Sequence, residues 1–208
     1  MDAHIITLTG AITTSLLLLV LPSQTKAQEM ESRVPRYEIN LTVGVPGALV
    51  SSKEFPNSTG RYDHDLYYFY EPYYSIGMSP EMSLDANVNI REWLKVGGKL
   101  GYYTAWGNLI DPKTQKTIGN KEFSDFSLAG QVRFTFYKKP PFSVYAGVAA
   151  GATYRHGTDQ GNSISKLLTA YEILPLGYQI SYKSVYGIIE CAFGSMVLGG
   201  RIGIGCRF

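Results

Sequence analysis

The amino-acid sequence predicts an all-β fold, an eight-stranded antiparallel up-and-down β-barrel that crosses a membrane. Apolar and polar residues alternate along most of the chain, and a period of two places each set on one face of a strand. The connections between the alternating stretches are short and long in turn, as in transmembrane barrels. The composition combines 22 Gly and 16 Tyr with only 17% charged residues. A net charge of +2 without a basic run gives no sign of a nucleic-acid partner.

The N-terminal segment has the pattern of an export signal. Residues 5–21 are apolar or hydroxylated almost throughout, and the small residues Thr25 and Ala27 fit the −3 and −1 positions of a cleavage site. We therefore predict a signal peptide over residues 1–27 and a barrel domain over residues 28–208. The stretch before the apolar core carries no Lys or Arg, and an uncleaved anchor helix is the alternative.

The remaining chain contains eight alternating stretches and no segment with the period of an amphipathic helix. They cover residues 37–45, 82–90, 96–106, 126–136, 142–154, 174–182, 185–193 and 198–208. Pro175 lies inside the sixth stretch and predicts a bulge there, because proline cannot donate to a strand ladder.

The connections predict how the barrel is oriented. The tight turns are residues 92–94, 138–141 and 183–184, and the long loops are about 46–80, 107–125 and 157–169. A further short link lies near residues 195–196. Short turns face the periplasm and long loops face the outside of the cell in barrels of this kind.

The nature of each face predicts which one meets lipid. The polar face is mostly Gly, Ala, Ser, Thr and Asn, which suits the narrow interior of a small barrel better than a water-exposed exterior. Aromatic residues on the apolar face gather near both ends of the strands, as in the interfacial girdles of membrane barrels. They are Tyr37, Phe136, Phe142, Tyr182 and Phe208 at the short-turn end and Trp106, Phe126, Tyr154 and Phe193 at the other. The alternative is a soluble secreted barrel that binds small apolar ligands inside.

The C-terminal segment LPLGYQISYKSVYGIIECAFGSMVLGGRIGIGCRF, residues 174–208, resembles the last three strands of the bacterial outer-membrane β-barrel family. Residues 91–107, REWLKVGGKLGYYTAWG, resemble a central turn and strand of the same family. The size is similar to the small eight-stranded barrels of the OmpX and OmpA transmembrane type. The resemblance implies location in the outer membrane of a diderm bacterium, with its lipid bilayer as partner. It also implies an assembly signal, read by the outer-membrane assembly machinery, in the last strand: Ile202, Ile204, Cys206 and Phe208.

Charged residues on the polar face are the first candidates for function. They are Glu38, Asp85, Lys99, Arg133, Glu190, Arg201 and Arg207. They could line an ion pathway, but eight strands leave room only for side chains, so we predict a paired network that closes the interior.

Candidates for catalysis and metal binding are few. Some small outer-membrane barrels modify lipid A acyl chains with a His and a Ser, and His156 with Thr158 could form such a pair. Thr replaces the expected Ser and no acidic partner is evident, so we expect no catalytic residue and no enzyme activity. The three residues 63–65, Asp-His-Asp, could bind a metal but fit a solvated turn better. We expect no metal and no cofactor.

The two cysteines are predicted to be small apolar residues that face lipid. If the last hairpin turns near Met196, Cys191 and Cys206 are staggered by about four residues, or roughly 13 Å, which is too far for a disulfide.

The first long loop is the candidate for a surface interaction. It is rich in aromatic residues, and we select Tyr67, Tyr68, Phe69 and Tyr70 as binding residues. Exposed tyrosines make rigid amphipathic contacts at a low cost in conformational entropy, which suits an extracellular sugar or protein partner. Alternatively, residues 65–74 extend the first hairpin and pack their tyrosines across its strands. The sequence thus predicts a non-enzymatic outer-membrane barrel whose outer loops carry any further function.

Overall fold

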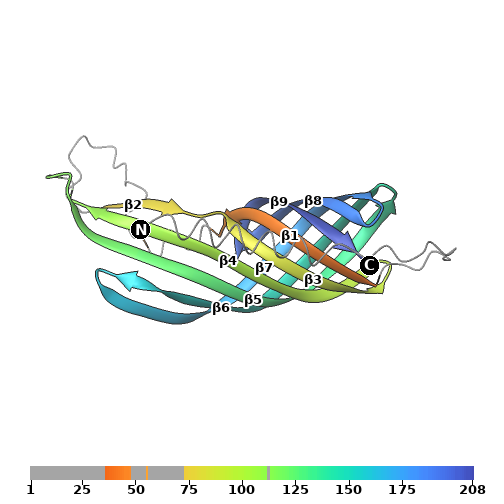
Figure 1. Cartoon of the computed structure of the whole chain (residues 1–208), viewed down its shortest axis with the longest axis horizontal. Coiled ribbons are helices and arrows are strands. Elements are labelled where there is room, and N and C mark those ends of the chain that lie inside the picture. Colours follow the sequence, from red (N-terminus) through yellow and green to blue (C-terminus); the bar gives the residue numbers. More distant parts are fainter. Residues whose placement is uncertain (1–35, 48–54, 56–72, 112) are drawn as a thin grey trace. The chain divides into compact units, whose positions relative to one another are not determined.

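The computed structural model describes residues 36–47, 55, 73–111 and 113–208, all within one compact unit, Val34–Phe208 (Figure 1). The signal peptide predicted over residues 1–27 lies outside the described residues. So do the metal candidate at residues 63–65 and the candidate binding residues Tyr67, Tyr68, Phe69 and Tyr70.

The described chain forms nine strands, all paired antiparallel. They are β1 (Tyr37–Pro46), β2 (Tyr73–Met78), β3 (Glu81–Arg91), β4 (Leu94–Ile110), β5 (Thr117–Lys139), β6 (Phe142–Asp159), β7 (Asn162–Tyr182), β8 (Val185–Gly194) and β9 (Val197–Arg207). The described part of the chain has no helix long and apolar enough to cross a membrane.

The sheet closes into a ring. Its strands follow the order β4-β3-β1-β9-β8-β7-β6-β5, and β5 pairs again with β4. β2 continues the line of β3, because both pair with the same edge of β4, β2 with Ala105–Ile110 and β3 with Leu94–Tyr102. The chain ends beside its first strand, where the Tyr37 and Phe208 amides each donate to the other's carbonyl at 3.0 Å. The all-β antiparallel prediction is therefore confirmed.

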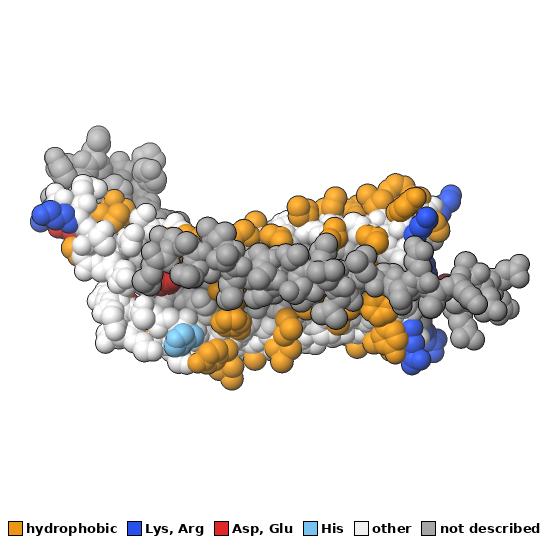
Figure 2. Space-filling view, viewed as in Figure 1, with side chains coloured by type: hydrophobic (Ala, Val, Ile, Leu, Met, Phe, Trp, Pro, Cys, Tyr) orange, Lys and Arg blue, Asp and Glu red, His pale blue; other side chains and the backbone are white. Residues whose placement is uncertain are grey.

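The two faces of the ring differ as predicted. The apolar side chains of most strands point outward, and Leu128, Phe136 and Ile202 expose 63–65% of their surface. The polar and charged side chains point inward and are buried, among them Asn40, Thr42, Asp85 and Lys99. Orange hydrophobic side chains spread over the visible part of the strand surface in Figure 2, between charged groups at the two ends.

The three tight turns lie at the positions predicted from the sequence. β3 and β4 join at Glu92 and Trp93, β5 and β6 at Pro140 and Pro141, and β7 and β8 at Lys183 and Ser184. These three connections, the start of β1 and the end of β9 lie at the same end of the ring. We call it the short-turn end.

Two of the predicted long loops are wrong. Residues 107–125 and 157–169 are mostly strand, because β4 and β5 pair as far as Ile110 and Thr117, and β6 and β7 as far as Asp159 and Asn162. The second hairpin closes with only Gln160 and Gly161, both at positive φ, 49° and 84°, as a tight two-residue hairpin turn requires. The strands β4 to β7 thus extend beyond the ends of β8 and β9.

The tip of the first of these hairpins is held by one aspartate. Asp111 accepts hydrogen bonds from the Lys113 amide at 3.0 Å and the Thr114 hydroxyl at 2.7 Å. These donors stabilise the ionised carboxylate, so they lower the pKa of Asp111 from its ordinary value.

The bulge predicted at Pro175 is confirmed, and it corrects one assignment. The β7–β8 register shifts between Ile173 and Leu176, so the alternation of inward and outward side chains along β7 reverses there. Leu174, predicted to face outward with Tyr178, is buried inside the ring.

The cysteine stagger is larger than predicted. Cys191 pairs with Gly200, so Cys206 lies six residues farther along β9, about 20 Å away. Both thiols are free, as expected.

Candidate functional site

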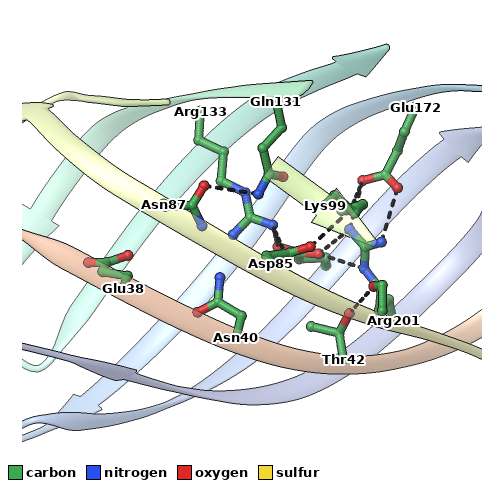
Figure 3. Close-up of polar contacts among 12 residues, drawn as sticks. Glu38, Asn40, Thr42, Asp85, Asn87, Lys99, Gln131, Arg133, Glu172 and Arg201 are labelled. Atoms are coloured by element: carbon green, nitrogen blue, oxygen red, sulfur yellow. Dashed lines mark hydrogen bonds and ion pairs between the residues drawn. The ribbon is translucent and has the colours of Figure 1, made fainter. Parts of the chain in front are cut away.

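The interior of the ring holds a layer of buried ion pairs, which is the candidate functional site (Figure 3). At its centre Lys99 on β4 donates to Glu172 on β7 at 2.7 Å. Arg201 on β9 donates to the same carboxylate at 2.7 and 3.0 Å and, through Nε, to Glu190 on β8 at 2.7 Å. None of these four side chains exposes more than 4% of its surface.

A second set of contacts continues this layer toward β3 and β5. Arg133 donates to Asp85 at 2.6 Å and lies 3.2 Å from Glu190, whose carboxylate also accepts the Tyr145 hydroxyl at 2.6 Å. The Lys99 ammonium is 3.9 Å from the second oxygen of Asp85. Each carboxylate in the layer therefore has cationic partners, as buried charges require.

The ion pairs connect opposite walls of the ring. Lys99 and Glu172 lie on β4 and β7, which are separated by β5 and β6 in the shorter direction around the sheet. Arg133 and Glu190 lie on β5 and β8, which are separated by β6 and β7. Side chains from the two walls therefore meet across the interior.

A smaller cluster lies toward the short-turn end. The Lys95 ammonium is 2.7 Å from the Glu38 carboxylate, which also accepts the Tyr186 hydroxyl at 3.3 Å. Arg207 donates to the Ser181 hydroxyl at 2.6 Å, and its guanidinium lies 4.8 Å from the centre of the Tyr186 ring.

A third cluster lies toward the hairpin tips. Arg155 holds Asp125 through two hydrogen bonds of 2.7 Å, and the Tyr103 hydroxyl donates to the same carboxylate at 2.6 Å. The Arg155 guanidinium also lies 4.0 Å from the centre of the Phe123 ring. Phe55 stacks on Phe123 with 5.7 Å between the ring centres, and Phe55 is only 1% exposed. A buried apolar contact therefore lies next to the ion pair.

Glycines give the interior aromatics their space. A Cβ on Gly177 would lie 2.5 Å from the Tyr145 ring, and a Cβ on Gly205 would come still closer to the Tyr186 ring. Any larger residue at these positions would displace the tyrosines that hydrogen-bond Glu190 and Glu38.

The seven interior charges predicted from the sequence all face the interior, and they form two groups. Asp85, Lys99, Arg133, Glu190 and Arg201 belong to the central layer, whereas Glu38 and Arg207 belong to the cluster near the short turns. The predicted pairing of charges is confirmed for six of the seven, whereas Arg207 hydrogen-bonds the Ser181 hydroxyl.

The candidates chosen from the sequence omit several interior residues. They are Glu81, Lys95, Tyr103, Asp125, Tyr145, Arg155, Glu172 and Tyr186. The alternation along β4 already placed Lys95 and Tyr103 on the polar face. Glu172 was missed because its strand was predicted to begin at residue 174. Glu81, directly before the second predicted strand, is 1% exposed, and its carboxylate makes no hydrogen bond with the residues described.

The candidate catalytic pair does not form a hydrogen-bonded unit. His156 and Thr158 both lie on the outer face of β6, where His156 is paired with Ser124 and Ser165, and Thr158 with Glu122. Across the described residues, no hydrogen bond connects the His156 ring to a hydroxyl. The Ser165 hydroxyl instead contacts the Tyr154 hydroxyl at 2.8 Å.

The residues of the predicted assembly signal lie on the outer face of β9 and at its end. Ile202, Ile204 and Phe208 expose 56–65% of their surface, and Cys206 is partly exposed. Within the described ranges, no group of three or more His, Cys, Asp or Glu side chains is placed to hold a metal ion.

The comparisons with known proteins add little to this geometry. No protein-family model and no curated protein matches the chain. Among solved structures, the chain is similar to the N-terminal β-barrel domain of Pseudomonas aeruginosa OprF, with a TM-score of 0.46 and 6% sequence identity. That similarity covers 84% of this chain and 100% of the OprF domain.

Proposed function

We propose that this protein is a non-enzymatic integral β-barrel of the bacterial outer membrane, closed to ions and active through its outer loops. The observation that carries the proposal is the inverted polarity of the ring. Its exterior exposes large apolar side chains from nearly every strand, whereas its interior buries charged side chains, most of them paired. A soluble protein rarely exposes so continuous an apolar surface, but a membrane barrel requires one.

The height of the apolar band supports the same proposal. On β5 the outward aromatics Phe126 and Phe136 are ten residues apart, and a tilted strand needs about 9–11 residues to cross the hydrocarbon core. The outward Tyr102 on β4 contacts Phe126 with ring centres 4.7 Å apart, and Trp93 stacks on Phe134 at 6.2 Å near the short turns. These rings form the two interfacial girdles of the proposed barrel.

The proposed orientation puts the short turns in the periplasm and the hairpin tips outside the cell. The surface role is assigned chiefly to the connection over residues 46–80 and its tyrosines. A signal peptide over residues 1–27 delivers the chain to the periplasm. The assembly machinery recognises the outward side chains of β9.

Gel mobility together with surface proteolysis tests the proposal. The full chain in membrane fractions should migrate differently before and after boiling, and protease added to whole cells should cut only in the segment 46–80 and at the hairpin tips. A single unshifted band in the periplasmic or secreted fraction would contradict it and would favour the soluble ligand-binding barrel.

Planar bilayers with the purified protein should show no large, stable channel. The charged layer bridges opposite walls, and eight strands leave room only for side chains, so no continuous water column passes it. Single-channel recording checks this, with a known open porin as the positive control. Reproducible large conductance steps would show that the layer opens.

Replacement of Tyr67, Tyr68 and Tyr70 by Ser should weaken binding of a surface partner at least about tenfold, since each buried aromatic contact contributes 1 kcal/mol or more, about fivefold in affinity. The readouts are binding of the protein to a glycan array and adhesion of expressing cells to a protein-coated surface. Tyr137→Ser, a half-exposed tyrosine beside the short turns, is the matched control. Equal binding by all variants would rule out a contact role for these tyrosines.

An enzyme that modifies lipid A acyl chains is the weaker alternative. Unchanged lipid A acylation after deletion and overexpression would eliminate it.

A further inference from the structure

The short-turn end of the ring carries an excess of exposed positive charge. Its exposed cations are Arg36 before β1, Arg91 at the end of β3, Lys138 and Lys139 at the end of β5, and Lys183 between β7 and β8. Glu92 is the one exposed acidic side chain at this end within the described ranges. We call these five cations the basic rim; blue side chains gather at this end in Figure 2.

The basic rim is distributed around the ring and does not form a patch on one side. Each of the three tight turns supplies at least one cation, and Arg36 supplies another where β1 meets β9. A compact ligand or a single docked protein would contact one sector of such an arrangement. A bilayer surrounds a membrane barrel on all sides, so its surface can meet all five cations.

Contacts with tyrosines of the aromatic girdle place the basic rim at the level of the lipid headgroups. The Arg36 guanidinium lies 5.8 Å from the centre of the Tyr37 ring, and the Lys183 ammonium lies 5.5 Å from the centre of the Tyr182 ring. Tyrosine rings at a membrane boundary lie at the level of the headgroups. Cations beside them therefore reach the layer of lipid phosphates.

Among the described residues, the opposite end lacks this excess. Its exposed lysines Lys113, Lys116 and Lys166 are accompanied by Asp111, Glu122 and Asp159, and Asp159 pairs with Lys121 at 3.5 Å. The described hairpin tips thus have mixed charge, and the excess belongs to the short-turn end.

We propose that the basic rim binds the phosphate groups of anionic phospholipids in the leaflet that surrounds the short-turn end. This inference rests on the proposed membrane-spanning function. Each Lys or Arg near an anionic membrane surface raises affinity about fivefold at low salt, and salt screens the attraction. The rim therefore selects anionic over zwitterionic lipids and fixes the vertical position of the barrel.

Lipid selectivity of the reconstituted full-length protein tests the proposal. The protein is refolded into phosphatidylcholine vesicles, and the association of spin-labelled phosphatidylglycerol is compared with that of spin-labelled phosphatidylcholine by electron paramagnetic resonance. The wild type should prefer phosphatidylglycerol by about fivefold or more, and 0.5 M NaCl should reduce this preference. The triple variant K138Q/K139Q/K183Q should lose most of it.

The triple variant K113Q/K116Q/K166Q is the matched control, because it removes the same number of charges from the hairpin tips. It should keep the wild-type preference. A heat-dependent gel shift of every variant first establishes that it is folded in the vesicles.

The outcomes separate the two proposals. A folded, inserted protein without lipid preference, or equal losses in the two triple variants, would overturn the basic rim and leave the membrane barrel intact. Failure of the wild type to insert into any vesicle would overturn both.

Discussion

Arg201→Met is expected to lower the free energy of unfolding by about 3–5 kcal/mol. Arg201 is 1% exposed and is the cation shared by Glu172 and Glu190. Its removal leaves the buried carboxylates of Glu172 and Glu190 with fewer cationic partners. An uncompensated buried charge costs far more free energy than the loss of the contact itself. Urea titration of the protein in vesicles, followed by tryptophan fluorescence and by the gel shift, measures the change.

Two further variants separate a buried charge effect from general damage. Lys166→Met removes an exposed cation outside the basic rim and should change the stability by less than about 0.5 kcal/mol. Adding Glu190→Gln to Arg201→Met should restore part of the stability, because it removes one of the uncompensated charges. A loss below about 1 kcal/mol for Arg201→Met, with no recovery in the double variant, would contradict the interior network.

Leu128→Arg is expected to destabilise the protein by about 1–2 kcal/mol in a lipid bilayer, because residue 128 lies between the girdle and the midplane, where the cost reaches about 2–4 kcal/mol. Leu128 is 64% exposed on the outer face of β5, within the band bounded by Phe126 and Phe136. An arginine there must lie in hydrocarbon or deform the bilayer around it. The change in unfolding free energy in vesicles is the measurement.

Ile118→Arg provides the matched control on the same strand. Ile118 is also apolar and 54% exposed, but it lies near the tip of the β4–β5 hairpin, beyond the aromatic girdle. Its replacement should change stability by no more than about 0.5 kcal/mol. If Leu128→Arg were equally harmless, the outer face would be in water and the membrane assignment would fail.

The alternating pattern predicted the strand faces well because each side chain's direction follows from its own backbone. Inward Asp85, Lys99 and Arg133 and outward Leu128 and Ile202 were assigned correctly on this ground. The tight turns followed from their turn residues in the same local way. Residues 107–110, 117–125, 155–159 and 162–173 were missed as strand, because apolar and polar residues do not alternate regularly there.

The pairing partners could not be predicted from the sequence. Lys99 and Glu172 are 73 residues apart and meet only because the ring closes with one particular register. The bulge near Pro175 could be anticipated, but not the reversal of parity that buries Leu174. Phe55 gave no local signal for its place against Phe123.

The sequence by itself thus determined that strands form, which side chains face out, and where the tight turns lie, because these properties depend on residues two to four positions apart. The tertiary structure decided which charges neutralise one another and how far the hairpins extend. It also arranged the cations of separate turns around one rim. Those features join residues far apart in the chain, and only the closure and register of the ring bring them together.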